Sequence, residues 1–210
     1  MSADGTSYST LAGPVRYEPD KIKGSRFIAC AAPVTSEEEA GAFLDEVRAE
    51  FDDARHVCWA WRVLPPSGAT RSNDDGEPSG SAGRPILAQI EGHELFGLAC
   101  GVVRYFGGVK LGVGGLMRAY GGAAGQALDR AEIARVDVRV AVACEHPYSD
   151  SNAVQALLAR YGLEPRDAEY GADVRFTCDV PAADLDAFRT DLVEATAARA
   201  RSTVGPEPGA

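Results

Sequence analysis

The sequence predicts an α+β protein made of two domains. A chain of 210 residues is long enough to form two separate cores, and its apolar share of 45% is ordinary for a soluble globular protein. Strand-like and helix-like segments alternate along the chain, and this pattern restarts near residue 136. We therefore expect a flexible lead-in over residues 1–19, a first domain over 20–135, a second domain over 136–201 and a flexible tail over 202–210.

Three apolar runs in the first domain indicate buried strands. They are residues 27–34, 57–64 and 95–106. A helix should follow the first strand, because Ser36 and Glu39 have the spacing of a capping box. The apolar residues of this helix recur on one side, as expected for a helix that covers a sheet. They are Ala40, Phe43, Leu44, Val47 and Phe51.

Two more helices are expected in the first domain. One runs from Pro85, which suits a first helical turn, to Gly92. The other extends from about Gly115 to Ala131, and its many small residues would let it lie close to the sheet. Residues 65–83 form a long loop rich in turn residues, and such a loop in a compact domain is usually functional or disordered.

The second domain repeats the alternation in the order strand, helix, strand, strand, helix. The expected elements are a strand at 136–144, a helix capped by Ser149 or Asp150 and ended by Gly162, a hairpin of 166–170 and 174–180 that turns at Gly171, and a helix at 184–200. This order predicts a ferredoxin-like module built on a split βαβ unit.

The chain is acidic, and this limits the partners that it can have. It carries 31 Asp and Glu residues against 21 Lys and Arg residues. Phosphate neutralisation needs clustered cations, so neither a general nucleic-acid coat nor sequence-specific DNA binding is expected. Residues 1–135 carry 14 cations and 18 acids and residues 136–210 carry 7 and 13, so a local basic patch belongs to the first domain.

The cysteines and the hydropathy indicate a cytoplasmic protein. The five cysteines are widely spaced, and no two form a Cys-x-x-Cys pair, which favours reduced core thiols. No apolar run approaches the roughly 20 residues that a membrane helix needs, so no membrane segment is expected. His56 and Cys58 would share one face of a strand, but no third ligand is apparent, so no metal site is assigned.

One segment of this acidic chain contains no acid. From Leu95 to Leu128, 34 residues carry no Asp or Glu but hold ten glycines and the cations Arg104, Lys110 and Arg118. A Walker A loop would need Ser or Thr after Lys110, and a dinucleotide fingerprint would need Gly in place of Met117, so both motifs fail. The glycines that open the third helix could form a general anion site with Arg118, or could serve tight packing.

An acidic loop precedes this window. Asp74, Asp75 and Glu77 fall within four residues, where like charges repel unless something compensates them. Three interpretations stay open: a tight turn with ion pairs to Arg84 and Arg104, a contact site for a partner, and a site for Mg²⁺ or Ca²⁺. The turn with ion pairs is favoured.

These two motifs together resemble a known family. The first is Asp74-Asp75-Gly76-Glu77-Pro78-x-Gly80-Ser81-Ala82-Gly83-x-Pro85, and the second is Val103-Arg104-Tyr105-Phe106-Gly107-Gly108-x-x-Leu111-Gly112-x-Gly114-Gly115-Leu116-x-Arg118-Ala119-Tyr120. With the strand at 56–61, they resemble the IMPACT family in its bacterial, YigZ-like branch. The resemblance extends from about Lys21 to Ala131, and the second domain looks like the extra ferredoxin-like domain of bacterial members.

The resemblance implies a fold and a cellular process. The first domain would have the fold of the second domain of ribosomal protein S5, and the two domains together would be similar in architecture to the fourth and fifth domains of elongation factor G. A translation-regulating role is implied, in association with the ribosome, RNA or a translation factor and without a cofactor. Eukaryotic members regulate a stress kinase and carry an added amino-terminal domain. About 20 residues ahead of the core leave no room for that domain, so the kinase role is not expected.

The favoured hypothesis is a non-catalytic regulator that docks through the face formed by residues 79–83 and 104–118. The candidate binding residues are Asp74, Asp75, Glu77, Ser81, Arg84, Arg104, Tyr105, Gly107, Gly108, Lys110, Gly112, Gly114, Gly115, Arg118, Tyr120 and His56. In this hypothesis the cations contact phosphate or carboxylate groups and the glycines let a partner approach closely. The acids order the loop or meet cations of the partner.

Two other classes of function stay open. An enzyme would place a nucleotide or phosphometabolite at residues 112–115, with Asp75 or Glu77 holding Mg²⁺, by analogy with small-molecule kinases of an S5-like fold. A protein-interaction module would instead act through the acidic second domain.

Overall fold

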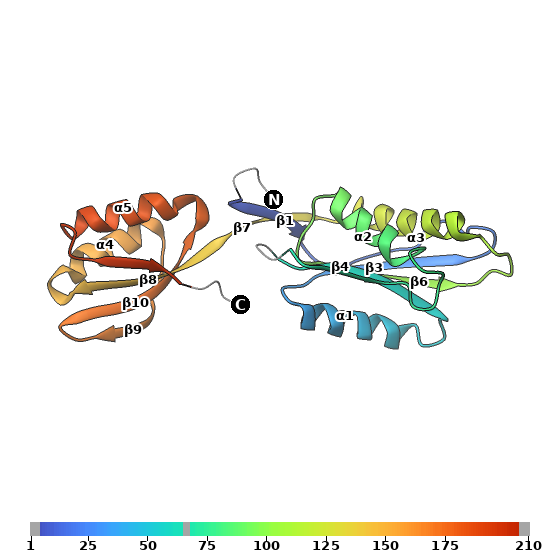
Figure 1. Cartoon of the computed structure of the whole chain (residues 1–210), viewed down its shortest axis with the longest axis horizontal. Coiled ribbons are helices and arrows are strands. Elements are labelled where there is room, and N and C mark those ends of the chain that lie inside the picture. Colours follow the sequence, from blue (N-terminus) through green and yellow to red (C-terminus); the bar gives the residue numbers. More distant parts are fainter. Residues whose placement is uncertain (1–4, 65–67, 206–210) are drawn as a thin grey trace. The chain divides into compact units, whose positions relative to one another are not determined.

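The computed structural model describes residues 5–64 and 68–205, which form two compact units (Figure 1). The first unit spans Tyr8–Val136, and the second contains the described residues 5–7 and 137–205. The division falls one residue beyond the boundary predicted at residue 135. Residues 1–4 of the predicted lead-in, 65–67 of the predicted loop and 206–210 of the predicted tail lie outside the described residues.

A five-stranded antiparallel sheet forms the centre of the first unit, in the strand order β2-β3-β6-β4-β5. Its strands are β2 (Val15–Tyr17), β3 (Arg26–Pro33), β6 (Leu98–Tyr105), β4 (His56–Arg62) and β5 (Thr70–Asn73). Helix α1 (Glu37–Glu50) covers one face, and helices α2 (Gly83–Gly92) and α3 (Val113–Leu128) cover the other (Figure 1). The predicted strands and helices of this domain are therefore present, with ends shifted by a few residues.

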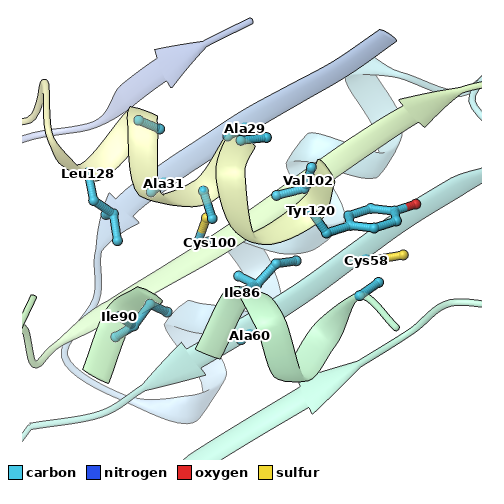
Figure 2. Packing of buried hydrophobic residues seen from close by; sticks show 14 of the residues in the cluster. Ala29, Ala31, Cys58, Ala60, Ile86, Ile90, Cys100, Val102, Tyr120 and Leu128 are labelled. Carbon is cyan, nitrogen blue, oxygen red and sulfur yellow. The ribbon is translucent and has the colours of Figure 1, made fainter. Parts of the chain in front are cut away.

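The two faces of this sheet carry different apolar side chains. Those that face α2 and α3 are mostly small, and they include Ala29, Ala31, Cys58, Ala60, Cys100 and Val102 (Figure 2). Those that face α1 are larger on average, and they include Ile28, Cys30, Val57 and Val103. Successive residues of a strand point to opposite faces, so a strand covered on both faces is apolar throughout. This explains the continuous apolar runs of β3 and β6.

Helix α1 begins as its capping-box spacing predicts. The Ser36 hydroxyl oxygen accepts a hydrogen bond from the backbone N–H of Glu39 at 3.2 Å. The Glu39 carboxylate accepts from the backbone N–H and the hydroxyl of Thr35, at 2.6 and 2.7 Å, instead of from Ser36. The acidic first turn, residues 37–39, also complements the positive end of the helix.

The second unit contains a four-stranded antiparallel sheet in the order β11-β8-β10-β9. Its elements are β8 (Arg139–Pro147), α4 (Ser151–Tyr161), β9 (Arg166–Tyr170), β10 (Asp173–Pro181), α5 (Leu185–Ala195) and β11 (Arg201–Val204), with single 3₁₀ turns η1 (Tyr148–Asp150) and η2 (Ala182–Asp184) before the two helices. Val142, Phe176 and Phe188 lie in a core that belongs to this unit. Helix α4 ends at Gly162, which has a φ of 62°, as predicted.

The predicted flexible lead-in contains two strands. Strand β1 (Ser7–Leu11) pairs with β7 (Ile133–Asp137), and β2 pairs with β3. Leu11 is 2% exposed and belongs to the core beneath α2 and α3, so this segment is held by apolar burial. The prediction of a loose lead-in is therefore wrong for residues 7–11 and 15–17.

The end of the second unit also differs from the prediction. The helix expected over 184–200 ends at Ala195, because Ala197 and Ala198 adopt φ values of 48° and 65° that no α-helix accommodates. The chain then forms β11, which pairs with β8, where a flexible tail was predicted. This strand completes a second split βαβ arrangement in the same sheet.

All five cysteines are buried and free. Burial raises the pKa of Cys58 and of Cys100 to about 12, so both thiols stay protonated at neutral pH. Over residues 5–64 and 68–205, no helix is long and apolar enough to cross a membrane.

Candidate binding face

Asp74, at the start of the acidic loop (residues 74–83), caps helix α2 from a distance. Its carboxylate accepts hydrogen bonds from the backbone N–H groups of Gly80 at 2.7 Å and of Ala82 and Gly83 at 2.9 Å each. Residue Ala82, at the cap position itself, has no side chain that could do this. Burial alone would raise the pKa of the Asp74 carboxyl. The three N–H donors together lower this pKa by more than burial raises it, so it lies below its ordinary value.

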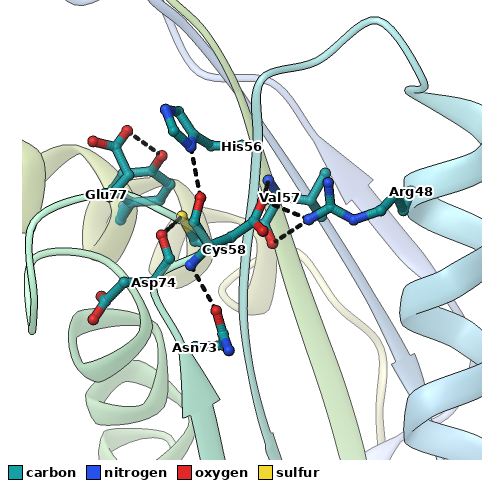
Figure 3. A network of polar contacts seen from close by, with 9 residues as sticks. Arg48, His56, Val57, Cys58, Asn73, Asp74 and Glu77 are labelled. Atoms are coloured by element: carbon teal, nitrogen blue, oxygen red, sulfur yellow. Dashed lines mark hydrogen bonds and ion pairs between the residues drawn. The ribbon is translucent and has the colours of Figure 1, made fainter.

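Asp75 holds the loop to the sheet and to α1. Its Oδ2 atom accepts a hydrogen bond from the Val57 N–H at 2.7 Å and forms an ion pair with Arg48 at 2.5 Å (Figure 3). Its carbonyl oxygen lies 2.6 Å from His56 Nδ1. Because a carbonyl oxygen can only accept, Nδ1 of His56 carries the hydrogen. This places His56 in the framework of the loop.

Glu77 joins the loop to β6 and α3. Its Oε1 atom lies 2.5 Å from Arg104 Nη1 and accepts a hydrogen bond from the Tyr120 hydroxyl at 2.8 Å. The side chains of Glu77 and Arg104 are 5% and 8% exposed. The Arg104 guanidinium also lies over the rings of Phe27 and Phe106, at 5.7 and 5.6 Å from their centroids.

The acidic loop is therefore an internal scaffold. Its three carboxylates diverge toward α2, α1 with β4, and β6 with α3, so they do not share one ligand position. No group of three His, Cys, Asp or Glu residues that could hold a metal ion occurs within the part of the chain that is described. The interpretation of a tight turn with ion pairs describes the loop best, but its cations are Arg104 and Arg48, whereas Arg84 is exposed.

Several predicted contact residues are inaccessible to a partner. Ser81 and Tyr120 are both fully buried, and Arg104 is 7% exposed. Tyr105 packs with the cluster on the α1 side of the sheet, where its hydroxyl donates to Asp53 at 2.5 Å, so it does not lie with Glu77. The assignment of Ser81, Arg104 and Tyr120 to direct contact is corrected accordingly, because they are buried in the framework of the loop. Tyr105 is half-buried on the other face of the sheet.

Gly107 serves close packing. A Cβ atom at this position would lie 1.9 Å from the carbonyl carbon of Gly24 and 2.2 Å from the nitrogen of Ser25, so any other residue would displace backbone. The Gly107 N–H donates to the Ser25 hydroxyl at 3.1 Å. A glycine is therefore needed at position 107 because its backbone lies against the backbone of Gly24 and Ser25.

The remaining glycines of the motif open helix α3. Gly112 stands at its cap position with a φ of 70° and offers no side-chain cap, and Gly114 and Gly115 lie in its first turn. Gly108 has a φ of 90°. A Cβ atom added to Gly108 or to Gly112 would have no other atom within 4 Å. The turn is shaped by backbone conformation and is open to solvent, with Lys110 and Arg118 exposed on it.

Four large apolar side chains are exposed on the same segment. They are Phe106 (56%), Val109 (50%), Val113 (52%) and Met117 (45%). We call the exposed residues of 106–118 the Gly-rich face. This apolar component was not predicted from the sequence. The helical spacing contains a signal of it, because Val113 and Met117 stand four residues apart and off the buried stripe of Leu116 and Tyr120.

Comparisons with known proteins place these features in a wider group. Residues 23–128 match the family described as Impact N-terminal domain, and residues 144–199 match the family described as Domain of unknown function (DUF1949). The two matches cover the larger part of the two units respectively.

Individual relatives match over most of their length. The chain is 38% identical over 177 residues to the IMPACT family member YigZ of Escherichia coli (strain K12), covering 83% of this chain and 87% of that protein. It is 47% identical over 160 residues to the IMPACT family member in pol 5'region of Thermus thermophilus, covering 76% and 86%. A solved structure titled "Crystal structure of an hypothetical protein" is 35% identical, with a TM-score of 0.76, and the match covers 97% of this chain and 99% of that one.

Proposed function

The chain belongs to the IMPACT family, and on this basis we propose that it acts without catalysis in translation, by docking on the ribosome through the Gly-rich face. The observation that carries the proposal is the composition of that face. Lys110 and Arg118 are exposed there among four exposed apolar side chains, and no acid occurs between residues 95 and 128 of a strongly acidic chain.

Charge selects the kind of surface that this face can meet. A chain with a net charge of −10 is repelled by phosphate, so contact with ribosomal RNA requires a region without carboxylates. The three carboxylates of the acidic loop, Asp74, Asp75 and Glu77, are all bonded to N–H groups or arginines. The Gly-rich face is thus a cationic region on an acidic protein.

The loop framework supports docking by holding the face rigid. Arg104 stands two residues before Phe106 and is fixed by Glu77, and Gly107 is fixed by its approach to Gly24. A binding residue whose support is ordered in advance loses less conformational entropy when a partner binds. In this view the acidic loop supports the Gly-rich face, and the Gly-rich face binds the partner.

Fold-level likeness supports the same process by analogy. The order strand, helix, strand, strand, helix, strand and the sheet order β11-β8-β10-β9 support a ferredoxin-like identity for the second unit. The likeness of the first unit to the second domain of ribosomal protein S5, and of both units to domains of elongation factor G, stays a prediction.

Co-sedimentation with purified bacterial ribosomes at low salt tests the proposal. The wild-type protein should pellet with ribosomes, and the double variant Lys110→Glu, Arg118→Glu should remain in the supernatant. Replacing Val113 and Met117 by Ser should weaken binding at all salt concentrations, because these side chains lie at the apolar centre of the face. Arg189→Glu with Arg201→Glu is the matched control, since it changes the net charge equally in the second unit.

Two outcomes would contradict the proposal. Wild-type protein that never pellets with ribosomes removes the function itself. Equal loss of binding in the Lys110/Arg118 variant and in the Arg189/Arg201 control would show that overall charge, and not the Gly-rich face, governs the association.

A further inference from the structure

Strand β11 lies at the edge of the sheet in the second unit. It stands first in the order β11-β8-β10-β9, and within the described part of the chain it pairs with β8 on one side only. The two strands are antiparallel, and residues 201–204 lie opposite residues 145–142. The other side of an edge strand carries backbone donors and acceptors that no strand of the sheet uses.

The pairing of β11 with β8 shows which of its backbone groups point outward. The Gly205 N–H donates to the carbonyl oxygen of Ala141 at 2.9 Å, and this pair continues the register of the two strands. In an antiparallel pair, residues that bond to the partner strand alternate with residues whose N–H and C=O groups point away from it. Residues 201, 203 and 205 therefore bond to β8, whereas the N–H and C=O groups of Ser202 and Val204 point outward.

A groove separates this free edge from helix α5. Its volume is about 760 Å³. Ser202 lines it on the side of the sheet. On the side of the helix it is lined by a stripe with the spacing i, i+3, i+4 and i+7, which consists of Asp186, Arg189, Thr190 and Val193. An edge strand that runs beside a helix across a groove is an arrangement that accepts an added strand.

The groove contains exposed apolar surface. Val193 of α5 is 46% exposed, and Val204 of β11 is 48% exposed. Val204 stands opposite Val142, which belongs to the core between the sheet and its helices. Because paired residues share a face, the side chains of Val204 and Ser202 point to the helix side of the sheet. The residues with outward backbone groups are thus the ones whose side chains face the groove.

The charges of the groove are balanced. Asp186 and Glu194 line it together with Arg189 and Arg201. None of these four side chains forms an ion pair within residues 5–64 and 68–205. Equal numbers of acids and arginines favour neither a polyanion nor a polycation, so the groove suits an uncharged segment. A second copy of the chain is disfavoured, because residues 136–210 carry 7 cations and 13 acids, and like charges repel.

We infer that β11 and α5 form a binding site for an extended, uncharged segment of another protein, which joins the sheet as a fifth strand. The segment runs antiparallel to β11, as neighbouring strands do throughout this sheet. Its backbone pairs with the outward groups of Ser202 and Val204, and the residues that pair also point their side chains into the groove. β-Branched apolar residues fit these positions, because they favour strands and contact Val193. The site is independent of the Gly-rich face, which belongs to the first unit.

Fluorescence anisotropy on the full-length protein tests the inference with a labelled six-residue peptide that alternates valine and serine. N-Methylation removes a backbone donor, so two methylated forms of this peptide report which of its edges is bonded. We expect the unmethylated peptide to bind, because its valines fit the groove. The form methylated on the valines should bind about tenfold more weakly, and the form methylated on the serines should keep its affinity.

Variants of the protein test the same pairing from the other side. Val204→Pro removes an outward N–H but keeps the bonds to β8, so peptide binding should weaken about tenfold in a folded protein. Val193→Asp places a charge in the groove and should weaken binding by a similar factor. Thr203→Val changes a side chain of the same strand on the opposite face of the sheet and should leave binding unchanged.

Three results would overturn the inference: no binding of the unmethylated peptide, equal binding of the two methylated peptides, or unchanged binding by Val204→Pro. Sedimentation velocity tests the other occupant of this edge. A wild-type dimer that becomes a monomer in Val204→Pro would show that a second copy covers β11, and this would also overturn the inference. Thermal unfolding of each variant separates a loss of binding from a loss of the fold.

Discussion

Glu77 and Arg104 form an ion pair 2.5 Å long in which both side chains are less than one-tenth exposed. No other ion pair found between described residues has both partners so deeply buried. Because Tyr120 donates to the same carboxylate oxygen, the pair joins the acidic loop, β6 and α3 at one point. Three parts of the chain that are distant in sequence thus depend on one carboxylate.

Breaking this pair should destabilise the first unit strongly. Glu77→Ala leaves the Arg104 charge buried without a partner, and we expect a loss of about 3–5 kcal/mol in the free energy of unfolding. Tyr120→Phe removes one hydrogen bond but keeps the ion pair, so its expected cost is about 1 kcal/mol. Urea unfolding of both variants measures the difference. Similar small losses in the two variants would mean that Arg104 finds water or another acceptor when Glu77 is absent.

Asp74 should make the stability of the protein depend on pH in the acidic range. Its pKa is lowered in the folded state, so its carboxylate stabilises the fold above the unfolded pKa of about 3.9, and this contribution is lost as the pH falls through the lower folded value. Asp74→Asn should be less stable than wild type at neutral pH, and the gap between them should narrow below about pH 4. Thermal melts over this range measure the gap. A gap that stays constant with pH would show that the charge of Asp74 contributes nothing.

Gly107 and Gly122 should respond oppositely to the same substitution. Gly107→Ala places a Cβ atom within 2.3 Å of the backbone of Gly24, so the two segments must separate and the turn must move. We expect it to destabilise the first unit and to weaken ribosome binding. Gly122 lies inside α3, and a Cβ there would meet nothing within 4 Å, so Gly122→Ala should stabilise the helix by about 0.5–1 kcal/mol. Chemical unfolding of both variants compares them, and destabilisation by Gly122→Ala would contradict the packing described for α3.

The elements with strong periodicity could be predicted from the sequence. The cap and the apolar stripe of α1 predict this helix. The continuous apolar runs of β3 and β6 predict strands that are covered by helices on both faces. Strands β1, β2, β5, β7 and β11 could not be predicted, because they are short and are defined by pairing with other segments. β1, for example, pairs with a strand more than a hundred residues away.

The candidate site was located by its two motifs, but the roles of its residues could not be read from them. Carboxylates are usually exposed, so Glu77 is expected at a surface until Arg104 and Tyr120 are known to surround it. Local sequence contains no trace of an interaction across 27 or 43 positions. Exposed apolar residues likewise cannot be told from buried ones until the buried side of α3 is known. Met117 could therefore be assigned to the site only from the structure.

Strand β11 has a practical consequence for work on this protein. It covers β8 over residues 142–145, so the backbone groups of β8 find their partners in the last residues of the sheet. A chain cut after Ala200 would leave β8 as an open edge next to Val142 and Cys144, and unpaired edges of this kind join with other chains. A shortened protein that ends there should therefore aggregate, whereas one that keeps Val204 should stay monodisperse.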